Sequence, residues 1–175
     1  MTDASHSVGK QQFEKQVRFL IAMTKKFEVN QNAARIALVQ FNHEPTIEFE
    51  FLTDSNEIGV ALTNLEYVPG GTFTGKSMSF AYDKFFKNNR RKVDGKRVNR
   101  SVVVITDGKS EDRVDIISKK INNNGVISLA LGYNQSNEKQ LIQIAGGDKN
   151  RVFQGQTVES LAKFNEQMVQ QICNL

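Results

Sequence analysis

Residues 101–108 read SVVVITDG, and this stretch indicates the fold more clearly than any other. Residues 101–106 are almost entirely β-branched and apolar, which is typical of a strand buried on both faces of a parallel sheet. Asp107 and Gly108 follow directly, so the strand ends in a polar turn. In open α/β sheets, functional residues gather beyond the carboxyl ends of the strands. Asp107 is therefore the first candidate for a functional side chain.

Helical and strand-like patterns alternate along the rest of the chain. Apolar residues recur at helical spacing in residues 10–27, 54–65, 76–88, 111–122, 137–145 and 158–173. Strand-like runs occupy residues 34–41, 46–51, 126–131 and 151–153. A tight turn at residues 43–45 makes the first two strands an antiparallel pair. This alternation predicts one α/β domain over residues 1–175, with a Rossmann-like, doubly wound, mostly parallel sheet, one antiparallel edge strand and helices on both faces.

The composition suits an ordinary globular domain. Hydrophobic residues make up 39% of the chain and charged residues 24%, which allows both a core and a polar surface. No apolar run approaches the roughly 20 residues that cross a bilayer, and the first ten residues lack the apolar segment of a signal peptide. We expect either an intracellular protein or part of a longer one. The single cysteine, Cys173, is either a buried apolar residue or half of a disulfide whose partner lies outside this sequence.

Positive charge is concentrated in residues 84–100 (KFFKNNRRKVDGKRVNR). Eight basic residues and one acid give this segment a charge of +7, so the other residues sum to −3 within the total of +4. Such a cluster can bind a polyanion, and a solvated loop that keeps the protein soluble is the simpler interpretation. The segment joins a helix end to the strand at 101–106, so we expect it at the opposite end of the sheet from Asp107. We expect no nucleic-acid partner and no membrane insertion.

Three short polar clusters offer oxygen ligands: residues 3–7 (DASHS), 72–75 (TFTG) and 106–108 (TDG). If the first and third clusters flank neighbouring strands, two carboxylates and several hydroxyls converge at one end of the sheet. Oxygen donors with few carboxylates suit Mg²⁺. Two carboxylates neutralise the two charges of the ion, and an incomplete shell leaves one position for an outside anion.

Together, the Asp-x-Ser-x-Ser sequence, the Gly-Gly-Thr-x-Thr-Gly loop and the hydrophobic strand ending in Thr-Asp-Gly resemble the von Willebrand factor type A domain. The sequence of the loop and the position of the late cysteine most resemble those of extracellular matrix members such as collagens and matrilins. The resemblance implies a binding module rather than an enzyme. It implies a metal-ion-dependent adhesion site, in which Mg²⁺ or Mn²⁺ captures a glutamate or aspartate of a protein ligand. The metal ligands it implies are Asp3, Ser5, Ser7, Thr72 and Asp107.

The same resemblance implies lesser roles for two residues and a location for the protein. Thr74 braces the loop more readily than it replaces Thr72, and His6 points away from an all-oxygen site. The resemblance also implies an extracellular location, within a longer protein. Two possible N-glycosylation sites, at residues 99–101 and 134–136, agree with that location.

Simpler explanations exist for each cluster. Ser5 and Ser7 could cap a helix, and residues 106–108 could be a plain exit from a strand. The main functional alternative is a P-loop NTPase, because Gly70–Ser77 (GGTFTGKS) matches G-x-x-x-x-G-K-[ST]. A P-loop must follow a buried strand, whereas residues 61–69 (ALTNLEYVP) are interrupted by polar residues and end in proline.

The resemblance also implies a hydrophobic strand that runs directly into the Asp-x-Ser-x-Ser sequence at the centre of the sheet. Only Met1 and Thr2 precede Asp3, too few for a strand, so we expect this strand to be missing or truncated and the domain to be N-terminally incomplete. A missing strand leaves about 10 Å between its neighbours, at 34–41 and 101–106, and weakens the metal site. The alternative is a rearranged sheet in which those two strands pair directly. In extracellular relatives a late cysteine pairs with one just before this strand, which fits the same expectation.

Overall fold

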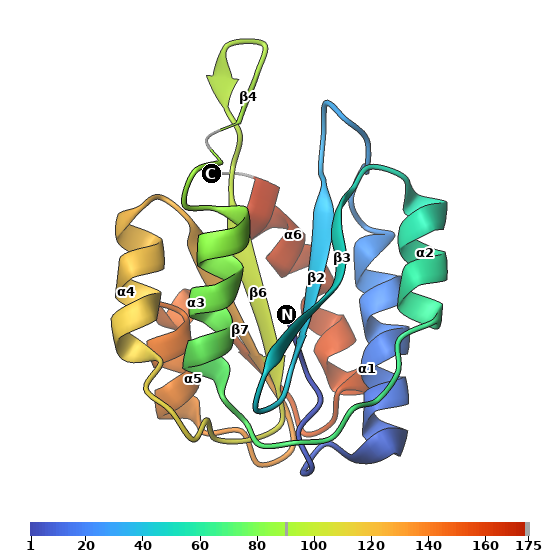
Figure 1. Cartoon of the computed structure of the whole chain (residues 1–175), viewed down its shortest axis with the longest axis vertical. Helices are drawn as coiled ribbons and strands as arrows, with labels where there is room; N and C mark the ends of the chain where they lie inside the picture. The colour runs from blue at the N-terminus through green and yellow to red at the C-terminus, as the bar shows by residue number, and fades with distance from the viewer. Residues whose placement is uncertain (90, 174–175) are drawn as a thin grey trace.

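A computed structural model describes residues 1–89 and 91–173 of the chain (Figure 1). Its main sheet has six strands in the order β3-β2-β1-β6-β7-β8. Their bounds are Thr2–Asp3 (β1), Ile36–Phe41 (β2), Pro45–Leu52 (β3), Ser101–Thr106 (β6), Ile127–Gly132 (β7) and Val152–Gln154 (β8). Every neighbouring pair is parallel except β2 and β3. The predicted mostly parallel sheet with one antiparallel edge strand is confirmed.

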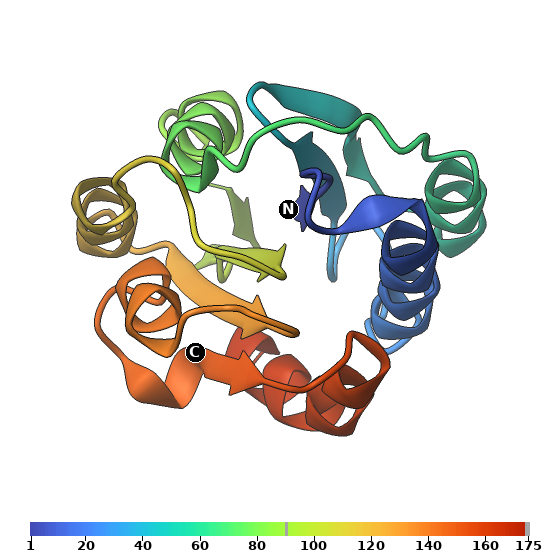
Figure 2. The same cartoon turned by 90° about the horizontal axis from the view of Figure 1, so that it is seen from below.

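Within the described residues, six α-helices surround the sheet (Figure 2). Their bounds are Gly9–Thr24 (α1), Ser55–Thr63 (α2), Thr74–Phe85 (α3), Asp115–Asn123 (α4), Glu138–Ile144 (α5) and Asn165–Cys173 (α6). Helices α1, α2 and α6 pack on one face, and α3, α4 and α5 pack on the other. The single helix expected over 158–173 is instead a 3-10 segment, Glu159–Phe164 (η2), followed by α6. A second 3-10 turn is Lys149–Arg151 (η1). No helix of the described chain is long and apolar enough to span a membrane.

Two apolar cores explain why residues 101–106 read as an unbroken apolar run. Val102 and Val104 face the core beneath α3, α4 and α5. Ile105 belongs to the core beneath α1 and α2, and Val103 packs against it. Successive side chains of a strand point to opposite faces, so a strand covered on both sides needs apolar residues at every position.

The first strand corrects one expectation. Thr2 and Asp3 do form a strand, β1, which lies between β2 and β6 and pairs with both. The Nε2 of Gln16, a buried residue of α1, donates to the carbonyl of Asp3 (3.0 Å), and its Oε1 accepts from the Thr2 hydroxyl (2.8 Å). Pairing on both sides and the buried side chain of Gln16 hold these two residues in place. The strand is as short as expected, and β2 and β6 do not pair directly.

A small hairpin projects from the far end of the sheet, where the sequence suggested only a loop. Strands Lys92–Val93 (β4) and Lys96–Arg97 (β5) pair in antiparallel fashion. Asp94 and Gly95 connect them with φ values of 49° and 76°, as a tight hairpin turn requires. The hairpin lies at the top of Figure 1, opposite the carboxyl ends of the parallel strands, as predicted for the basic segment.

Candidate metal centre

Asp3 and Asp107 come from two neighbouring strands and meet at the same edge of the sheet. Asp3 ends β1, and Asp107 directly follows β6. Both residues are buried. The carboxylate of Asp3 accepts hydrogen bonds from the backbone N–H of Ser5 (2.8 Å) and from the hydroxyl of Thr106 (2.6 Å). These bonds fix the Asp3 carboxylate beside the end of β6.

A chain of hydroxyls joins the first polar cluster to Asp107. The hydroxyls of Ser5 and Ser7 lie 3.1 Å apart, and the Ser7 hydroxyl donates to Asp107 Oδ1 (2.9 Å). The N-cap of α1 is Val8, without a side-chain cap hydrogen bond. The helix-capping interpretation of Ser5 and Ser7 is therefore wrong, because their hydroxyls point to each other and to a carboxylate. The first and third clusters converge as expected.

Burial makes both carboxylates hard to ionise. It raises the pKa of Asp3 from 3.8 to about 6, although hydrogen bonds from Thr106 and Ser5 oppose the shift. Burial also raises the pKa of Asp107, against the hydrogen bond from Ser7. Neither carboxylate forms an ion pair with any side chain in the described part of the chain. Two buried acids without a cationic partner favour the approach of a cation.

Thr72 lies in the adjoining loop and is held there by its backbone. Its N–H donates to Glu111 Oε1 (2.7 Å), and its carbonyl accepts from Glu111 N–H (2.8 Å) and from the Ser110 hydroxyl (3.1 Å). His6 ties this loop to the first cluster, since its backbone N–H donates to the carbonyl of Gly70 (2.9 Å) and its ring Nδ1 lies 2.8 Å from the same oxygen. His6 is otherwise exposed, as expected. Within the described residues, the Thr72 hydroxyl has no hydrogen bond to the other four predicted ligands.

Sequence reasoning missed several residues that position the site. Besides Gln16, these are Thr106, which binds Asp3, and Tyr67, whose hydroxyl donates to the carbonyl of Ser5 (3.0 Å). Thr106 belongs to the polar cluster at residues 106–108, but the sequence does not indicate that its hydroxyl binds Asp3. Gln16 and Tyr67 have no local signal, because their partners lie 13 to 62 residues away in the sequence.

The P-loop interpretation of Gly70–Ser77 is wrong. Residues 64–73 contain no strand, so the buried strand that must precede a P-loop is absent. The N–H groups of Gly75 and Lys76, which a P-loop would offer to phosphate, donate instead to the two carboxylate oxygens of Asp112 (2.8 and 2.6 Å). A carboxylate of the protein itself thus occupies this helix N-terminus.

The donor set at the edge of the sheet is rich in hydroxyls and poor in carboxylates. No group of three or more His, Cys, Asp or Glu side chains that could hold a metal ion occurs in the described residues. A site here would therefore rely on hydroxyl ligands together with two carboxylates, a set that suits a hard cation such as Mg²⁺.

The sequence is similar to matrix proteins across nearly its whole length. A family model described as von Willebrand factor type A domain matches residues 1–167. The collagen alpha-5(VI) chain of Mus musculus is 32% identical over 99% of this chain and 7% of its own length. Vitrin of Homo sapiens is 31% identical over 98% of this chain and 25% of its own, and matrilin-2 of Mus musculus is 27% identical over 98% and 18%. The chain thus spans a quarter or less of these relatives. That they are extracellular matrix proteins confirms the predicted location.

A solved structure shares the fold. Proximal thread matrix protein 1 from the mussel byssus has a TM-score of 0.85 and 22% identity, covering 98% of this chain and 44% of that one. One structure of that protein is described as having a zinc-occupied MIDAS motif. At this identity the likeness establishes the arrangement of strands and helices.

Proposed function

Because this chain belongs to the von Willebrand factor type A domain family, we propose that it is a non-enzymatic adhesion module that captures an acidic residue of a protein ligand through Mg²⁺ or Mn²⁺. One observation carries the proposal: the carboxylates of Asp3 and Asp107 are buried at one edge of the sheet and linked through Ser5 and Ser7, without a cationic partner in the described residues. A divalent cation supplies the missing positive charge.

The proposed ligands fall into two groups. Ser5, Ser7 and Thr72 offer hydroxyl oxygens, and Asp3 and Asp107 bind directly or through water. In binding a cation, the Ser7 hydroxyl exchanges its hydrogen bond to Asp107 for a metal contact. The two carboxylates balance the charge of the ion but do not complete an octahedral shell. The remaining position accepts a carboxylate from the partner, and the matrix proteins among the relatives make a matrix partner the natural candidate.

Calorimetric titration with Mg²⁺ or Mn²⁺ alone tests the site. We expect Asp107→Asn, which keeps the shape of the side chain and removes its charge, to weaken metal binding at least about tenfold. Asp54→Asn is the matched control: Asp54 caps α2 at a distant, exposed position, and asparagine caps equally well. Equal metal affinity in Asp107→Asn and in the unchanged protein would contradict the proposal.

A small carboxylate tests the capture step. N-acetylglutamate amide should shift the backbone amide signals of Gly108 and Ser7 only when Mg²⁺ or Mn²⁺ is present, and glutamine in place of glutamate should abolish the effect. Identical shifts in EDTA would show that the carboxylate does not bind through the metal.

We propose a second binding surface on the basic hairpin, defined as residues 91–97. Lys92, Lys96 and Arg97 are exposed on it. Within the described chain these residues have no ion pair, whereas the nearby Lys84 and Lys87 pair with Glu50 and Asp83. Uncompensated charge on a projecting hairpin favours a polyanion such as heparin.

A further inference from the structure

The basic hairpin is attached to the rest of the molecule by little besides its own backbone. Strands β4 and β5 have two residues each and pair only with each other in the described structure. Within residues 1–89 and 91–173, no hydrogen bond or ion pair joins residues 92–97 to a residue outside the hairpin. The base of the hairpin is closed by the N–H of Val98, which donates to the carbonyl of Arg91 (3.2 Å). A segment with so few bonds opens locally without unfolding the domain.

The hairpin also presents an exposed, extended backbone. It projects beyond the end of the main sheet (Figure 1), and both residues of β5, Lys96 and Arg97, are exposed. Because β4 and β5 form a sheet of two strands, the outer edge of β5 has no strand partner among the described residues. An enzyme that binds its substrate as an extended strand can pair with such an edge. Exposed loop tips are also the segments at which proteases cut folded proteins.

The side chains of the hairpin select the class of protease. Trypsin-like serine proteases hold a basic side chain in a pocket with an aspartate at its base. A guanidinium group suits this pocket, because it can bind a carboxylate through two parallel hydrogen bonds. Of the two arginines in the hairpin, Arg97 is exposed and Arg91 is half-buried. The bond that follows Arg97 is therefore the best substrate in the hairpin.

Two pairs of adjacent lysines offer the same chemistry but lie in helical structure. Lys119 and Lys120 are part of α4, where Lys120 forms an ion pair with Asp83. Lys25 and Lys26 directly follow α1, and their N–H groups donate to carbonyls of that helix (3.4 and 3.0 Å). Either pair must leave its helical hydrogen bonds before a protease can bind it as an extended strand. The structure thus distinguishes the hairpin from other basic pairs of the chain.

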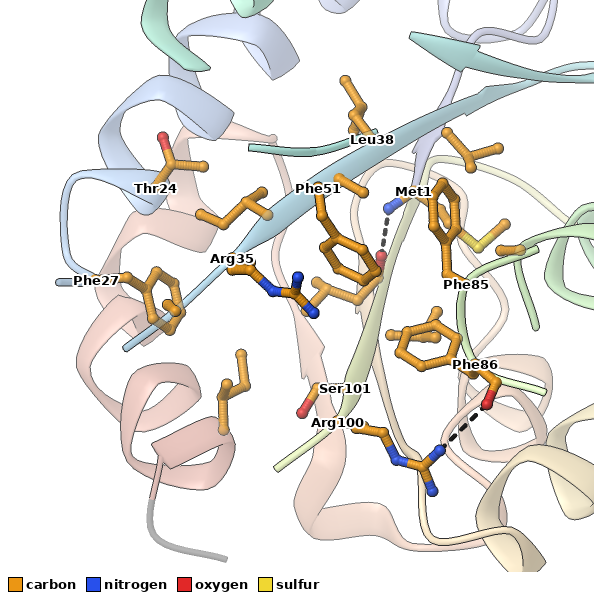
Figure 3. Close-up of a pocket in the computed structure, with 18 of the residues that line it drawn as sticks. Met1, Thr24, Phe27, Arg35, Leu38, Phe51, Phe85, Phe86, Arg100 and Ser101 are labelled. Atoms are coloured by element: carbon orange, nitrogen blue, oxygen red, sulfur yellow. Dashed lines mark hydrogen bonds between the residues drawn. The ribbon is translucent and has the colours of Figure 1, made fainter. Parts of the chain in front are cut away.

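The chain is firmly anchored on both sides of the hairpin. On the carboxyl-terminal side, the guanidinium of Arg100 donates to the carbonyls of Phe86 (3.2 Å; Figure 3) and Asn124 (2.5 Å). These bonds tie the start of β6 to the ends of α3 and α4, and β6 itself pairs with β1 and β7. On the amino-terminal side, α3 packs into the core through Met78 and Tyr82. A cut in the hairpin therefore leaves the two parts of the chain together.

We propose that the basic hairpin is a site of limited proteolysis, at which a trypsin-like serine protease of the extracellular space cleaves the Arg97–Val98 bond. Water adds a hydroxyl to the carbonyl carbon of Arg97 and a proton to the nitrogen of Val98, and the C–N bond between them breaks. The new carboxylate lies beside Lys96 and Arg97, and the strand that carries them becomes a chain end. Both changes weaken the binding of a polyanion. This consequence rests on the proposed polyanion surface, whereas the cleavage does not.

Brief digestion with a trace of trypsin tests the cleavage site. The protein is made without N-linked glycans, because a sugar on Asn99 would lie two residues from the bond. Mass spectrometry should find residues 1–97 and 98–175 as the first fragments. They should elute together from gel filtration, with the circular dichroism spectrum of the intact protein. A first cut at any other bond, or fragments that separate or lose this spectrum, would overturn the proposal.

Two double variants test which side chains direct the cut. Lys96→Ser/Arg97→Ser removes both basic residues that precede the bond and should slow the first cut at least about tenfold. Lys25→Ser/Lys26→Ser is the matched control, because it removes an exposed basic pair outside the hairpin, and should leave the rate unchanged. Equal rates in the two variants would contradict the role of the hairpin.

Heparin chromatography of the cleaved protein tests the consequence. The cleaved protein should elute at lower salt than the intact protein. Equal elution of the two forms would overturn the effect of cleavage on polyanion binding. If the intact protein is not retained at low salt, the polyanion surface and this effect both fail, whereas the fragment masses still decide the cleavage site.

Discussion

At the scale of single residues, the position of Asp3 shows that the site lowers the stability of the metal-free protein at neutral pH. Its carboxylate is buried at the end of β1, between a backbone N–H and the Thr106 hydroxyl. Those two bonds orient the side chain but do not supply a positive charge. Burial consequently raises its pKa from 3.8 to about 6.

The shifted pKa of Asp3 predicts a pH dependence. Between pH 4 and 6 the folded protein holds a proton on Asp3 that the unfolded chain has released, so the free energy of unfolding falls as pH rises through this window. A shift of about two units corresponds to about 3 kcal/mol. Urea unfolding in EDTA at pH 4 and pH 7 should show this fall, and Asp3→Asn should remove most of it. Asp107 contributes a smaller fall in the same direction.

Asp54→Asn is again the control, because it should keep the full pH dependence. The same fall in Asp3→Asn as in the unchanged protein would contradict the assignment of this pH dependence to Asp3.

At the scale of elements, the start of α3 is fixed to the loop that follows β6. Asp112 accepts from the N–H groups of Gly75 and Lys76, and the Ser110 hydroxyl accepts from the N–H of Thr74 (3.0 Å). The loop and the helix approach so closely that a Cβ on Gly75 would collide with the carbonyl oxygen of Arg113. This contact explains why glycine occupies the second position of the helix.

Replacing Gly75 should therefore destabilise the packing of the start of α3 against the loop that follows β6. We expect Gly75→Ala to lower the free energy of unfolding by about 1–3 kcal/mol, because the backbone must shift to admit the methyl group. Gly59→Ala, in α2 where nothing lies within 4 Å of the added carbon, should instead raise it by about 0.5–1 kcal/mol through helix propensity. Denaturant unfolding of both variants measures the difference. Equal effects of the two substitutions would show that the contact with Arg113 does not constrain Gly75.

At the scale of the whole molecule, the proposed cation site and the basic hairpin lie at opposite ends of the sheet. The buried carboxylates follow the carboxyl ends of β1 and β6, and the basic hairpin lies beyond the amino-terminal end of β6 (Figure 1). Exposed charges separated by more than about 8–10 Å are largely screened at physiological salt. One partner at each end can therefore bind independently of the other.

Heparin chromatography tests this arrangement. Retention should weaken with salt and stay the same in Mg²⁺ and in EDTA. The double variant Lys96→Ser/Arg97→Ser should elute at lower salt than the unchanged protein. Lys10→Ser/Lys139→Ser, which removes two exposed charges elsewhere, should shift elution less. Retention that requires Mg²⁺ would place heparin at the cation site instead.

The sequence by itself determined those features whose causes are local. The apolar run at 101–106 specifies a doubly buried strand, and the turn at 43–45 specifies the antiparallel pair. Asp54 caps α2 as predicted, accepting from the N–H groups of Asn56 and Glu57. Three short motifs in the right order were enough to identify the family, because each depends on residues within a few positions of one another.

Only the tertiary structure decided the features that depend on distant partners. Thr2 and Asp3 have no strand pattern of their own and become β1 because β2, β6 and Gln16 bind them. Ser7 binds Asp107, 100 residues away, instead of capping its own helix. Hydrogen bonds and register between remote segments are formed only when the chain folds, so no local pattern specifies them.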